Sequence, residues 1–257
     1  MDKTPHLPGK FVWFEHVSND LARARAFYEP LFGWHVEAMP MGAQTYHMLM
    51  VGGQGIGGLR TAEAGMPNHW ISYQSVNDVD AAHKAAVKAG AKSMLPPTDF
   101  PTVGRGAGII DPTGAALCLW KGSNGDAPDQ DPTPAGGWVW NELWTPDAGA
   151  ALTFYQTAFG YTHDVMDMGE QGKYYILKST DGKGRAGVMQ STMPGVPPMW
   201  LPYVNVADCD AAAAKASKLG AKQVVVPPTD IPGIGRFAVL LDPLGAAVAI
   251  IKPLPRT

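Results

Sequence analysis

Two stretches near the beginning of the chain return in its second half. Phe11-Val-Trp-Phe-Glu15 reappears as Trp138-Val-Trp-Asn-Glu142, 127 residues later. Ala26-Phe-Tyr-Glu-Pro-Leu-Phe-Gly-Trp34 returns at the same spacing as Thr153-Phe-Tyr-Gln-Thr-Ala-Phe-Gly-Tyr161. Two long matches that share one offset indicate an internal duplication, and a duplication decides the architecture before any single element does.

Three further motifs extend the repeat toward the end of each copy. They are Trp70-Ile-Ser-Tyr73 with Trp200-Leu-Pro-Tyr203, Pro96-Pro-Thr-Asp99 with Pro227-Pro-Thr-Asp230, and Asp111-Pro-Thr-Gly-Ala-Ala116 with Asp242-Pro-Leu-Gly-Ala-Ala247. We therefore predict two domains, residues 9–122 and 138–253. The segment 123–137 between them is rich in Gly, Pro and Asp and has no periodic apolar residues, which is typical of a surface linker.

The composition excludes several classes of protein. The chain has 257 residues, 46% of them hydrophobic, and a formal net charge of −3, whereas a nucleic-acid-binding protein would carry a basic face or tail. No run of about 18 apolar residues is present, so we expect no membrane span. Cys118 and Cys209 lie far apart in the sequence, which argues against a disulfide framework and a cysteine zinc site. A reducing, cytoplasmic location is therefore expected.

Each copy contains the same succession of short elements. A strand, a helix and three strands are followed by a second strand, helix and three strands, so the order βαβββ occurs twice in a copy and four times in the chain. The glycine-rich stretch at 52–58 lacks the Lys-Ser/Thr of a phosphate-binding loop, and we interpret it as part of a β-hairpin. In the first copy the expected helices are 21–32 and 79–89, and the expected strands are 11–17, 34–37, 45–51, 57–60, 70–76, 92–94, 107–110 and 115–120.

This pattern resembles the vicinal oxygen chelate superfamily, which includes glyoxalase I, extradiol dioxygenases and the bleomycin-resistance proteins. The residues that carry the resemblance are Phe27-Tyr28 before Gly33, Val76-Asn-Asp-Val-Asp80 at a helix start, and the Asp111-Pro-Thr-Gly114 turn before a last strand. The resemblance implies an α+β fold of tandem glyoxalase-like domains. Each domain would be two βαβββ modules that form a curved, partly open eight-stranded sheet with outer helices. The monomer would then act as a pseudo-dimer, with a further homodimer as an option.

Metalloenzymes of this superfamily hold a divalent ion with His, Gln or Glu side chains from four strand positions. The resemblance places no such residue at these positions, and the single possible ligand, Cys118, is not enough for a site that needs three or four convergent ligands. We therefore expect no metal and no cofactor. The eight positions are Trp13, about Gly58, Ile71 and Cys118 in the first copy, and Trp140, about Gly187, Leu201 and Ala249 in the second.

Two duplicated residue types are the candidates for ligand binding. Glu15 and Glu142 each follow a tryptophan by two residues, so the two side chains share one face of a strand. A carboxylate among aromatic rings can bind a ligand or act as an acid or base; a structural hydrogen bond or ion pair is the alternative. The aromatic candidates, which could line a cavity for a planar molecule or merely fill it, are Trp13, Tyr46, Tyr73, Trp140, Tyr174 and Tyr203.

The basic residues have simpler interpretations. Arg105 and Arg236 could clamp an anionic ligand, but we expect them to pair with Asp99 and Asp230. Most histidines have no counterpart in the other copy and are interpreted as surface or filling residues, with His69 kept as a weak ligand candidate. Among these unduplicated histidines is His16.

The sequence therefore predicts a protein without the usual metal ligands that binds a small planar organic molecule in an aromatic-lined cavity. The alternative is a lyase, isomerase or dioxygenase of the same superfamily that uses Glu15 or Glu142, or a non-standard metal site. A third possibility is an interaction protein whose cavities are filled by side chains. We expect a small-molecule ligand as the partner, with neither nucleic acid nor membrane.

Overall fold

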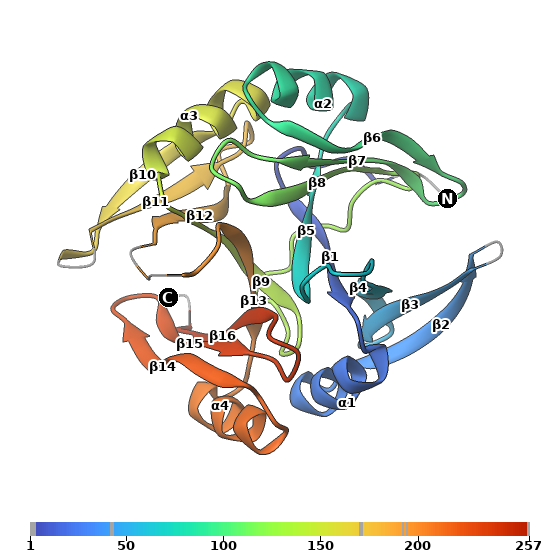
Figure 1. Ribbon diagram of the computed structural model, residues 1–257. Helices are drawn as coiled ribbons and strands as arrows, with labels where there is room; N and C mark the ends of the chain where they lie inside the picture. The colour runs from blue at the N-terminus through green and yellow to red at the C-terminus, as the bar shows by residue number, and fades with distance from the viewer. Residues whose placement is uncertain (1–3, 42–43, 170–171, 192, 194, 256–257) are drawn as a thin grey trace. The chain divides into compact units, whose positions relative to one another are not determined.

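The computed structural model describes residues 4–41, 44–169, 172–191, 193 and 195–255. Within these residues each copy of the repeat folds into eight strands and two helices, in the order that the sequence predicts (Figure 1). The first copy consists of β1 (Phe11–Ser18), α1 (Leu21–Phe32), β2 (His35–Met41), β3 (Gln44–Val51), β4 (Gln54–Thr61), β5 (His69–Ser75), α2 (Val79–Lys88), β6 (Lys92–Phe100), β7 (Gly104–Ile110) and β8 (Ala116–Gly122). The second consists of β9 (Trp138–Thr145), α3 (Ala148–Phe159), β10 (Thr162–Asp167), β11 (Lys173–Lys178), β12 (Gly184–Gln190), β13 (Met199–Asn205), α4 (Cys209–Lys218), β14 (Gln223–Ile231), β15 (Gly235–Leu241) and β16 (Ala247–Pro253).

The strands form two mixed eight-stranded sheets, one from each copy. The strand order is β2-β3-β4-β1-β5-β8-β7-β6 in the first sheet and β10-β11-β12-β9-β13-β16-β15-β14 in the second. Consecutive strands pair antiparallel as hairpins, whereas β1 pairs with β4 and β5 pairs with β8 in parallel. The first strand of every module therefore lies beside its last. This confirms the α+β fold class that the sequence predicts.

Local capping sets the ends of the helices. The carboxylate of Asp20 accepts a hydrogen bond from the amide of Arg23, which starts α1, and Gly33 ends it with φ 71°, a left-handed conformation that glycine adopts without strain. α3 is built in the same way from Asp147 and Gly160. The boundaries predicted for α1 are therefore confirmed, and α2 stops one residue before the predicted end.

The glycine-rich stretch forms β4, which confirms the hairpin interpretation over a phosphate loop. Its glycines permit close packing: a Cβ atom on Gly57 would lie 2.4 Å from the carbonyl oxygen of Phe14 on the neighbouring β1. No side chain fits at that distance. The turn between β3 and β4 contains Gly52 and Gly53, both with positive φ.

Contacts divide the chain into two compact units that differ from the two copies. Unit 1 comprises Met1–Val12, Ile71–Asp129 and Trp140–Trp200, and unit 2 comprises Trp13–Trp70, Gln130–Val139 and Leu201–Thr257. Each unit thus combines one module of the first copy with one module of the second. The division into domains at 9–122 and 138–253 stays a prediction.

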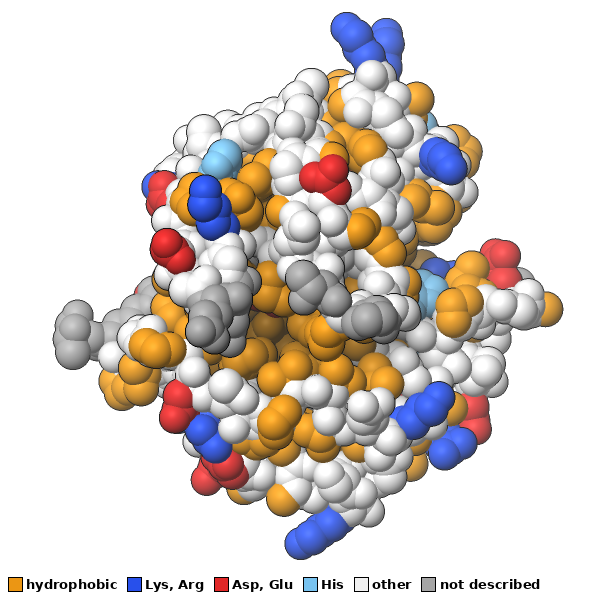
Figure 2. Space-filling view, turned by 60° about the vertical axis from the view of Figure 1, so that its left-hand side comes forward, with side chains coloured by type: hydrophobic (Ala, Val, Ile, Leu, Met, Phe, Trp, Pro, Cys, Tyr) orange, Lys and Arg blue, Asp and Glu red, His pale blue; other side chains and the backbone are white. Residues whose placement is uncertain are grey.

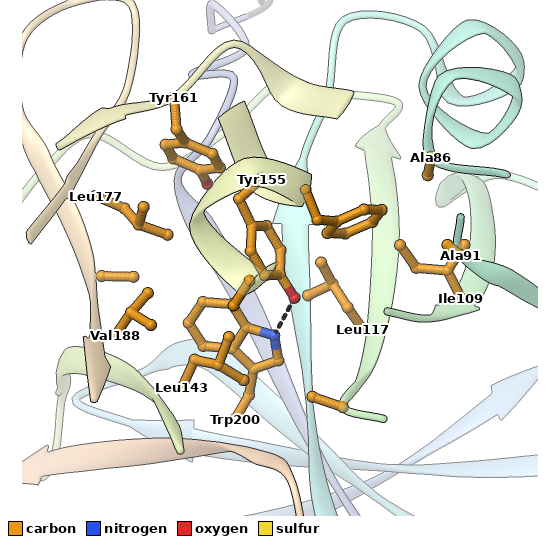
Figure 3. Close-up of a cluster of buried hydrophobic side chains, with 14 of the residues drawn as sticks. Ala86, Ala91, Ile109, Leu117, Leu143, Tyr155, Tyr161, Leu177, Val188 and Trp200 are labelled. Carbon is orange, nitrogen blue, oxygen red and sulfur yellow. Dashed lines mark hydrogen bonds between the residues drawn. The ribbon is translucent and has the colours of Figure 1, made fainter. Parts of the chain in front are cut away.

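The core of unit 1 lies where α2 packs against α3. Tyr155 of α3 is fully buried, and its hydroxyl accepts a hydrogen bond from Nε1 of Trp200 at 3.0 Å (Figure 3). Leu117 from the first copy and Leu143 from the second lie in the same buried cluster. The two copies therefore share this core.

The core of unit 2 contains a cluster of aromatic rings. Tyr28 of α1 is fully buried, and its hydroxyl accepts a hydrogen bond from Nε1 of Trp70 at 2.9 Å. The Trp138 ring lies 5.1 Å from that of Trp34 and 5.2 Å from that of Trp70, measured between centroids. In this unit α1 packs against α4, so the second core repeats the plan of the first.

The predicted linker 123–137 makes specific contacts in both units. Asp126 is 5% exposed, and its carboxylate accepts hydrogen bonds from the amide of Leu7 and the hydroxyl of Ser75. Farther along, the carbonyl oxygen of Gly136 accepts a hydrogen bond from Nε1 of Trp34 at 2.7 Å. Composition alone suggests a loose surface segment here, because a carboxylate that caps a distant backbone amide leaves no local sequence pattern.

Two further observations concern the hydropathy of the helices and the distribution of surface charge. None of the helices in the described part of the chain has both the length and the apolar character needed to cross a membrane. Figure 2 shows Lys, Arg, Asp and Glu side chains dispersed over one face among hydrophobic and uncharged ones.

Candidate functional site

A chain of three side chains links strands β1 and β3 in unit 2. Nε1 of Trp13 donates a hydrogen bond to the hydroxyl of Tyr46 at 2.8 Å, and that hydroxyl donates to Oε1 of Glu15 at 2.7 Å. The tryptophan and tyrosine are half-buried, whereas Glu15 is 6% exposed. We call this arrangement, and its counterpart in the other unit, the Trp–Tyr–Glu chain.

Unit 1 contains the same chain between β9 and β11. Nε1 of Trp140 donates to the hydroxyl of Tyr174 at 2.8 Å, and Tyr174 is hydrogen-bonded to Glu142. Glu142 is also 6% exposed. The structure thus brings together six of the eight predicted site residues in two equivalent groups of three.

A glycine opposite each glutamate makes room for the tyrosine. Gly58 of β4 lies directly across from Glu15, and Gly187 of β12 lies across from Glu142. A Cβ atom would lie 2.0 Å from the Tyr46 hydroxyl if placed on Gly58, and 1.8 Å from the Tyr174 hydroxyl if placed on Gly187. Any larger residue at these two positions would displace the tyrosine from its carboxylate.

Both tyrosines are held in the protonated form. Burial raises the pKa of Tyr46 far above its usual value, and the charge of the Glu15 carboxylate and the hydrogen bond to it raise it further. The pKa of Tyr174 is raised by burial and then by Glu142 in the same way. Each hydroxyl therefore acts as a donor to the carboxylate and as an acceptor from the indole, so the order of the chain is fixed.

The two chains differ in the second neighbour of the glutamate. Nε of Arg60 lies 3.4 Å from Oε2 of Glu15, with the arginine side chain 43% exposed. The equivalent position in unit 1 is Met189, and there Nε1 of Trp144 donates to Oε1 of Glu142 at 2.5 Å. A cation therefore accompanies one carboxylate, and a neutral indole donor accompanies the other.

Comparison with known proteins places the chain in a family. CFP32 of Mycobacterium tuberculosis (strain CDC 1551 / Oshkosh), provisionally named a glyoxylase, is 39% identical over 260 residues, which cover 99% of this chain and 98% of that protein. A family model described as the glyoxalase/bleomycin resistance protein/dioxygenase superfamily matches residues 10–119. The chain belongs to this superfamily.

Two further similarities support the assignment. DnrV of Streptomyces peucetius, named an anthracycline biosynthesis protein, is 32% identical over 267 residues that cover 97% of this chain and 95% of that protein. The Mn(II)-bound glyoxalase from Novosphingobium aromaticivorans has a TM-score of 0.62 and 17% identity, and the alignment covers 98% of this chain and 83% of that one. At such low identity the structural likeness shows the fold alone.

Two of the positions that the resemblance assigns to metal ligands, one on β4 and one on β12, are glycines. Gly58 and Gly187 offer no ligand atom, and tyrosine hydroxyls occupy the space beside them. In the parts of the chain that the structure describes, no group of three or more His, Cys, Asp or Glu side chains could hold a metal ion. A divalent ion in a protein needs three or four convergent ligands.

The remaining two predicted site residues lie outside the Trp–Tyr–Glu chains. Tyr73 is half-buried on β5, opposite Cys118 of β8 in the register, and its ring meets that of Trp120 edge-on at 6.0 Å. Tyr203 on β13 is 3% exposed, and its ring is stacked on Phe237. A role in ligand binding for either tyrosine stays a prediction.

The structural interpretation of the two arginines is confirmed. Nη1 of Arg105 lies 2.7 Å from Oδ1 of Asp99, and Nη1 of Arg236 lies 2.9 Å from Oδ1 of Asp230. Each guanidinium also forms a two-point contact with an aspartate in the first turn of a helix, Asp80 for Arg105. Each arginine therefore joins a hairpin, β6–β7 or β14–β15, to the helix that precedes it, α2 or α4.

Sequence reasoning missed a buried histidine–aspartate pair. His16 is fully buried, and its Nε2 lies 2.7 Å from Oδ2 of Asp242, which also accepts a hydrogen bond from the Tyr28 hydroxyl at 3.0 Å. In unit 1 the corresponding aspartate, Asp111, accepts from Tyr155 at 2.8 Å. The duplicated Phe-Tyr and Asp-Pro motifs were the available signal for the tyrosine–aspartate contacts, whereas no sequence pattern connects the unduplicated His16 with Asp242.

His69 makes a local contact. Its Nδ1 lies 2.8 Å from the carbonyl oxygen of Pro67. Burial lowers the pKa of this histidine, so its imidazole is uncharged at neutral pH.

Proposed function

We propose that this superfamily member binds a small planar organic molecule and works without the divalent metal ion of the family's metalloenzymes. The observation that carries the proposal is the Trp–Tyr–Glu chain, which recurs in both units with the same donors and acceptors. Recurrence on two different sequence backgrounds favours a role beyond filling space.

The side chains of these groups have the properties that such a ligand needs. Half-buried tryptophan and tyrosine rings offer flat apolar surfaces for stacking. A buried carboxylate beside them can accept a hydrogen bond from a ligand hydroxyl, because it offers about four acceptor sites. The combination of apolar walls with a few placed polar groups is the usual composition of a small-molecule site.

The relatives support the ligand class. DnrV is named for anthracycline biosynthesis, and anthracyclines are planar, hydroxylated polycyclic compounds. Rings of that shape match the stacking surfaces of Trp13 and Trp140, and their phenolic hydroxyls match the carboxylates of Glu15 and Glu142. The proposed ligand is therefore a hydroxylated polycyclic aromatic molecule.

The test is a titration of the full chain with 1,8-dihydroxyanthraquinone, followed by calorimetry, together with elemental analysis of the protein purified without chelators. We expect binding by metal-free protein and a loss of about tenfold or more in affinity when Trp13 or Trp140 is replaced by leucine, since a lost aromatic contact in a site costs about 1–3 kcal/mol. Arg236→Gln, which alters an exposed ion pair, is the control. Stoichiometric divalent metal, or equal affinity in the tryptophan variants, would contradict the proposal.

A further inference from the structure

Arg60 of β4 lies beside the Glu15 carboxylate without forming a tight ion pair with it. Its one hydrogen bond in the described part of the chain joins Nε to Oε2 of Glu15, at 3.4 Å. The terminal nitrogens, Nη1 and Nη2, have no hydrogen-bond or ion-pair partner among the described residues. Because the side chain is 43% exposed, Arg60 has N–H donors left for a molecule that approaches from solvent.

The other three arginines on the described strands are fully engaged. Arg105 of β7, Arg185 of β12 and Arg236 of β15 each form hydrogen bonds with two aspartates. These arginines fasten parts of the chain to one another. Arg60 has no second carboxylate partner among the described residues, so a structural tie of this kind does not explain it.

Unit 1 shows that a Trp–Tyr–Glu chain forms without a cation. Met189 occupies the position of Arg60, and Met199 occupies that of His69. The hydrogen bond between Trp140 and Tyr174 is made there nonetheless, at the same 2.8 Å as in unit 2. The arginine is therefore a difference between the two chains that the shared geometry does not require.

An apolar surface lies beside the Glu15 chain. Gly55 of β4 is exposed, and a Cβ atom on it would lie 2.8 Å from Sδ of Met48 and 3.4 Å from Cη2 of Trp13. Glycine thus lets these two side chains lie close to the strand, where they offer an apolar surface to a ring. The pKa of His69 is lowered by burial and by the charge of Arg60, so this imidazole is uncharged at neutral pH. The cation that a ligand meets beside Glu15 is Arg60.

We propose, on the basis of the function proposed above, that the Glu15 chain selects ligands by charge and takes planar hydroxylated aromatic molecules that carry a carboxylate. The guanidinium of Arg60 binds the carboxylate through two parallel N–H···O hydrogen bonds, a geometry that arginine favours. The ring of the ligand lies against Trp13, and Glu15 accepts a hydrogen bond from a ligand hydroxyl. The Glu142 chain, which has Met189 in place of the arginine, takes neutral members of the same class.

The experiment is an NMR titration of the ¹⁵N-labelled full chain with 1,8-dihydroxyanthraquinone and with its 3-carboxylate. The indole N–H signals of Trp13 and Trp140 report on the two chains separately, and the Trp13→Leu and Trp140→Leu variants assign them. We expect the Trp13 signal to shift at about fivefold lower concentration of the carboxylate than of the parent compound, because the charge-assisted contact is strong but Arg60 is partly exposed. The Trp140 signal should show no such preference.

Three variants test the role of Arg60. Arg60→Met should remove the preference at Trp13, and Met189→Arg should create one at Trp140, so each of these two variants decides the question if the other does not fold. Arg23→Met, which removes an exposed arginine of α1 in the same unit, is the control for net charge and should keep the preference.

Two kinds of result can be told apart. Equal shifts of the Trp13 signal by the two compounds, or a preference that survives in Arg60→Met, would overturn the selection by charge and leave the proposed function intact. No shift of either indole signal with either compound would overturn the proposed function, and the selection by charge with it.

Discussion

Units 1 and 2 are built from the same motifs but keep their polar groups in different places. Unit 2 has a buried histidine–aspartate pair in its core, His16 with Asp242, and an arginine beside the glutamate of its Trp–Tyr–Glu chain. At the corresponding positions unit 1 has Leu143 and Met189, which carry no charge. Both units bury carboxylates, but the basic side chains beside them are present in unit 2 and absent from the corresponding positions of unit 1.

Uncharged amides show the opposite distribution. Unit 1 buries Gln74 and Asn141, and unit 2 has Val204 and Phe14 in their places. What the two cores have in common, the contact between the Phe-Tyr helix end and the Asp-Pro turn, is therefore what holds the scaffold together. What differs between them is free to serve separate functions, and the following predictions test that division.

The largest expected effect is at the aspartates of the two Asp-Pro turns. Asp242→Asn removes the buried carboxylate that pairs with His16 and should lower the free energy of unfolding by about 3–5 kcal/mol. Asp111→Asn, where no histidine is present, should cost about 2 kcal/mol, because only hydrogen bonds to the carboxylate weaken. Urea denaturation measures both, and equal losses would show that His16 adds nothing to the core.

The His16–Asp242 pair should make the stability of unit 2 depend on pH in the acid range. Burial alone would raise the pKa of Asp242, but the hydrogen bond and charge of His16 and the amides of Ala246 and Leu244 lower it overall. A lowered carboxyl pKa adds stability that is fully present above about pH 4 and is lost as the pH falls through the lowered value. His16→Leu should move this loss to higher pH. Urea midpoints between pH 2 and pH 6 measure the shift, and identical profiles would contradict it.

The glycines opposite the two glutamates should be equally sensitive in both units. Gly58→Ala and Gly187→Ala each push a tyrosine hydroxyl from its carboxylate and should cost about 1–3 kcal/mol in the free energy of unfolding. Gly149→Ala in the first turn of α3 is the control, since its Cβ would meet one atom at 3.4 Å; it should be neutral or slightly stabilising. Thermal denaturation checks this, and a cost-free Gly58→Ala would contradict the close packing.

The smallest effect is expected at the exposed cation. Arg60→Met introduces the residue found at the equivalent position of unit 1, Met189. It should change the free energy of unfolding by at most about 1 kcal/mol, because the arginine side chain is 43% exposed and its Nε lies 3.4 Å from Oε2 of Glu15. The difference should shrink at high salt. Denaturation at two salt concentrations measures it, with Met189→Arg as the reciprocal variant. A salt-independent loss of several kcal/mol would mean that Arg60 has a buried role.

Features that depend on local sequence could be predicted. The bounds of α1 follow from Asp20 and Gly33. The hairpin of β3 and β4 follows from its glycines. Asp99 and Arg105 face each other across the β6–β7 hairpin, six positions apart. The fold class follows from the family resemblance, whose motifs occur in the same order in both copies. The helix bounds, the hairpin and the ion pair each depend on residues a few positions apart or on one turn.

Features that depend on strand register could not be predicted from the sequence. From the sequence, Gly58 was interpreted as a metal-ligand position that has lost its ligand. The structure instead shows that the Tyr46 hydroxyl lies close to Gly58. Predicting this contact would require knowing which residues of β3 and β4 face each other. His16 and Asp242 are separated by 226 positions, and no periodicity connects them. The candidate site was therefore predicted as a set of residue types, without the hydrogen bonds that order them.

The pairing of Tyr28 with Asp242 and of Tyr155 with Asp111 has a consequence for how the chain can be divided. Each buried tyrosine finds its carboxylate in the other copy of the repeat, so a cut between residues 122 and 138 would leave both cores half-built. The two fragments made by this cut should fold only when they are mixed, and neither should fold alone. Two separate copies of the repeat would have to associate to make these contacts, which the duplicated chain makes within one molecule.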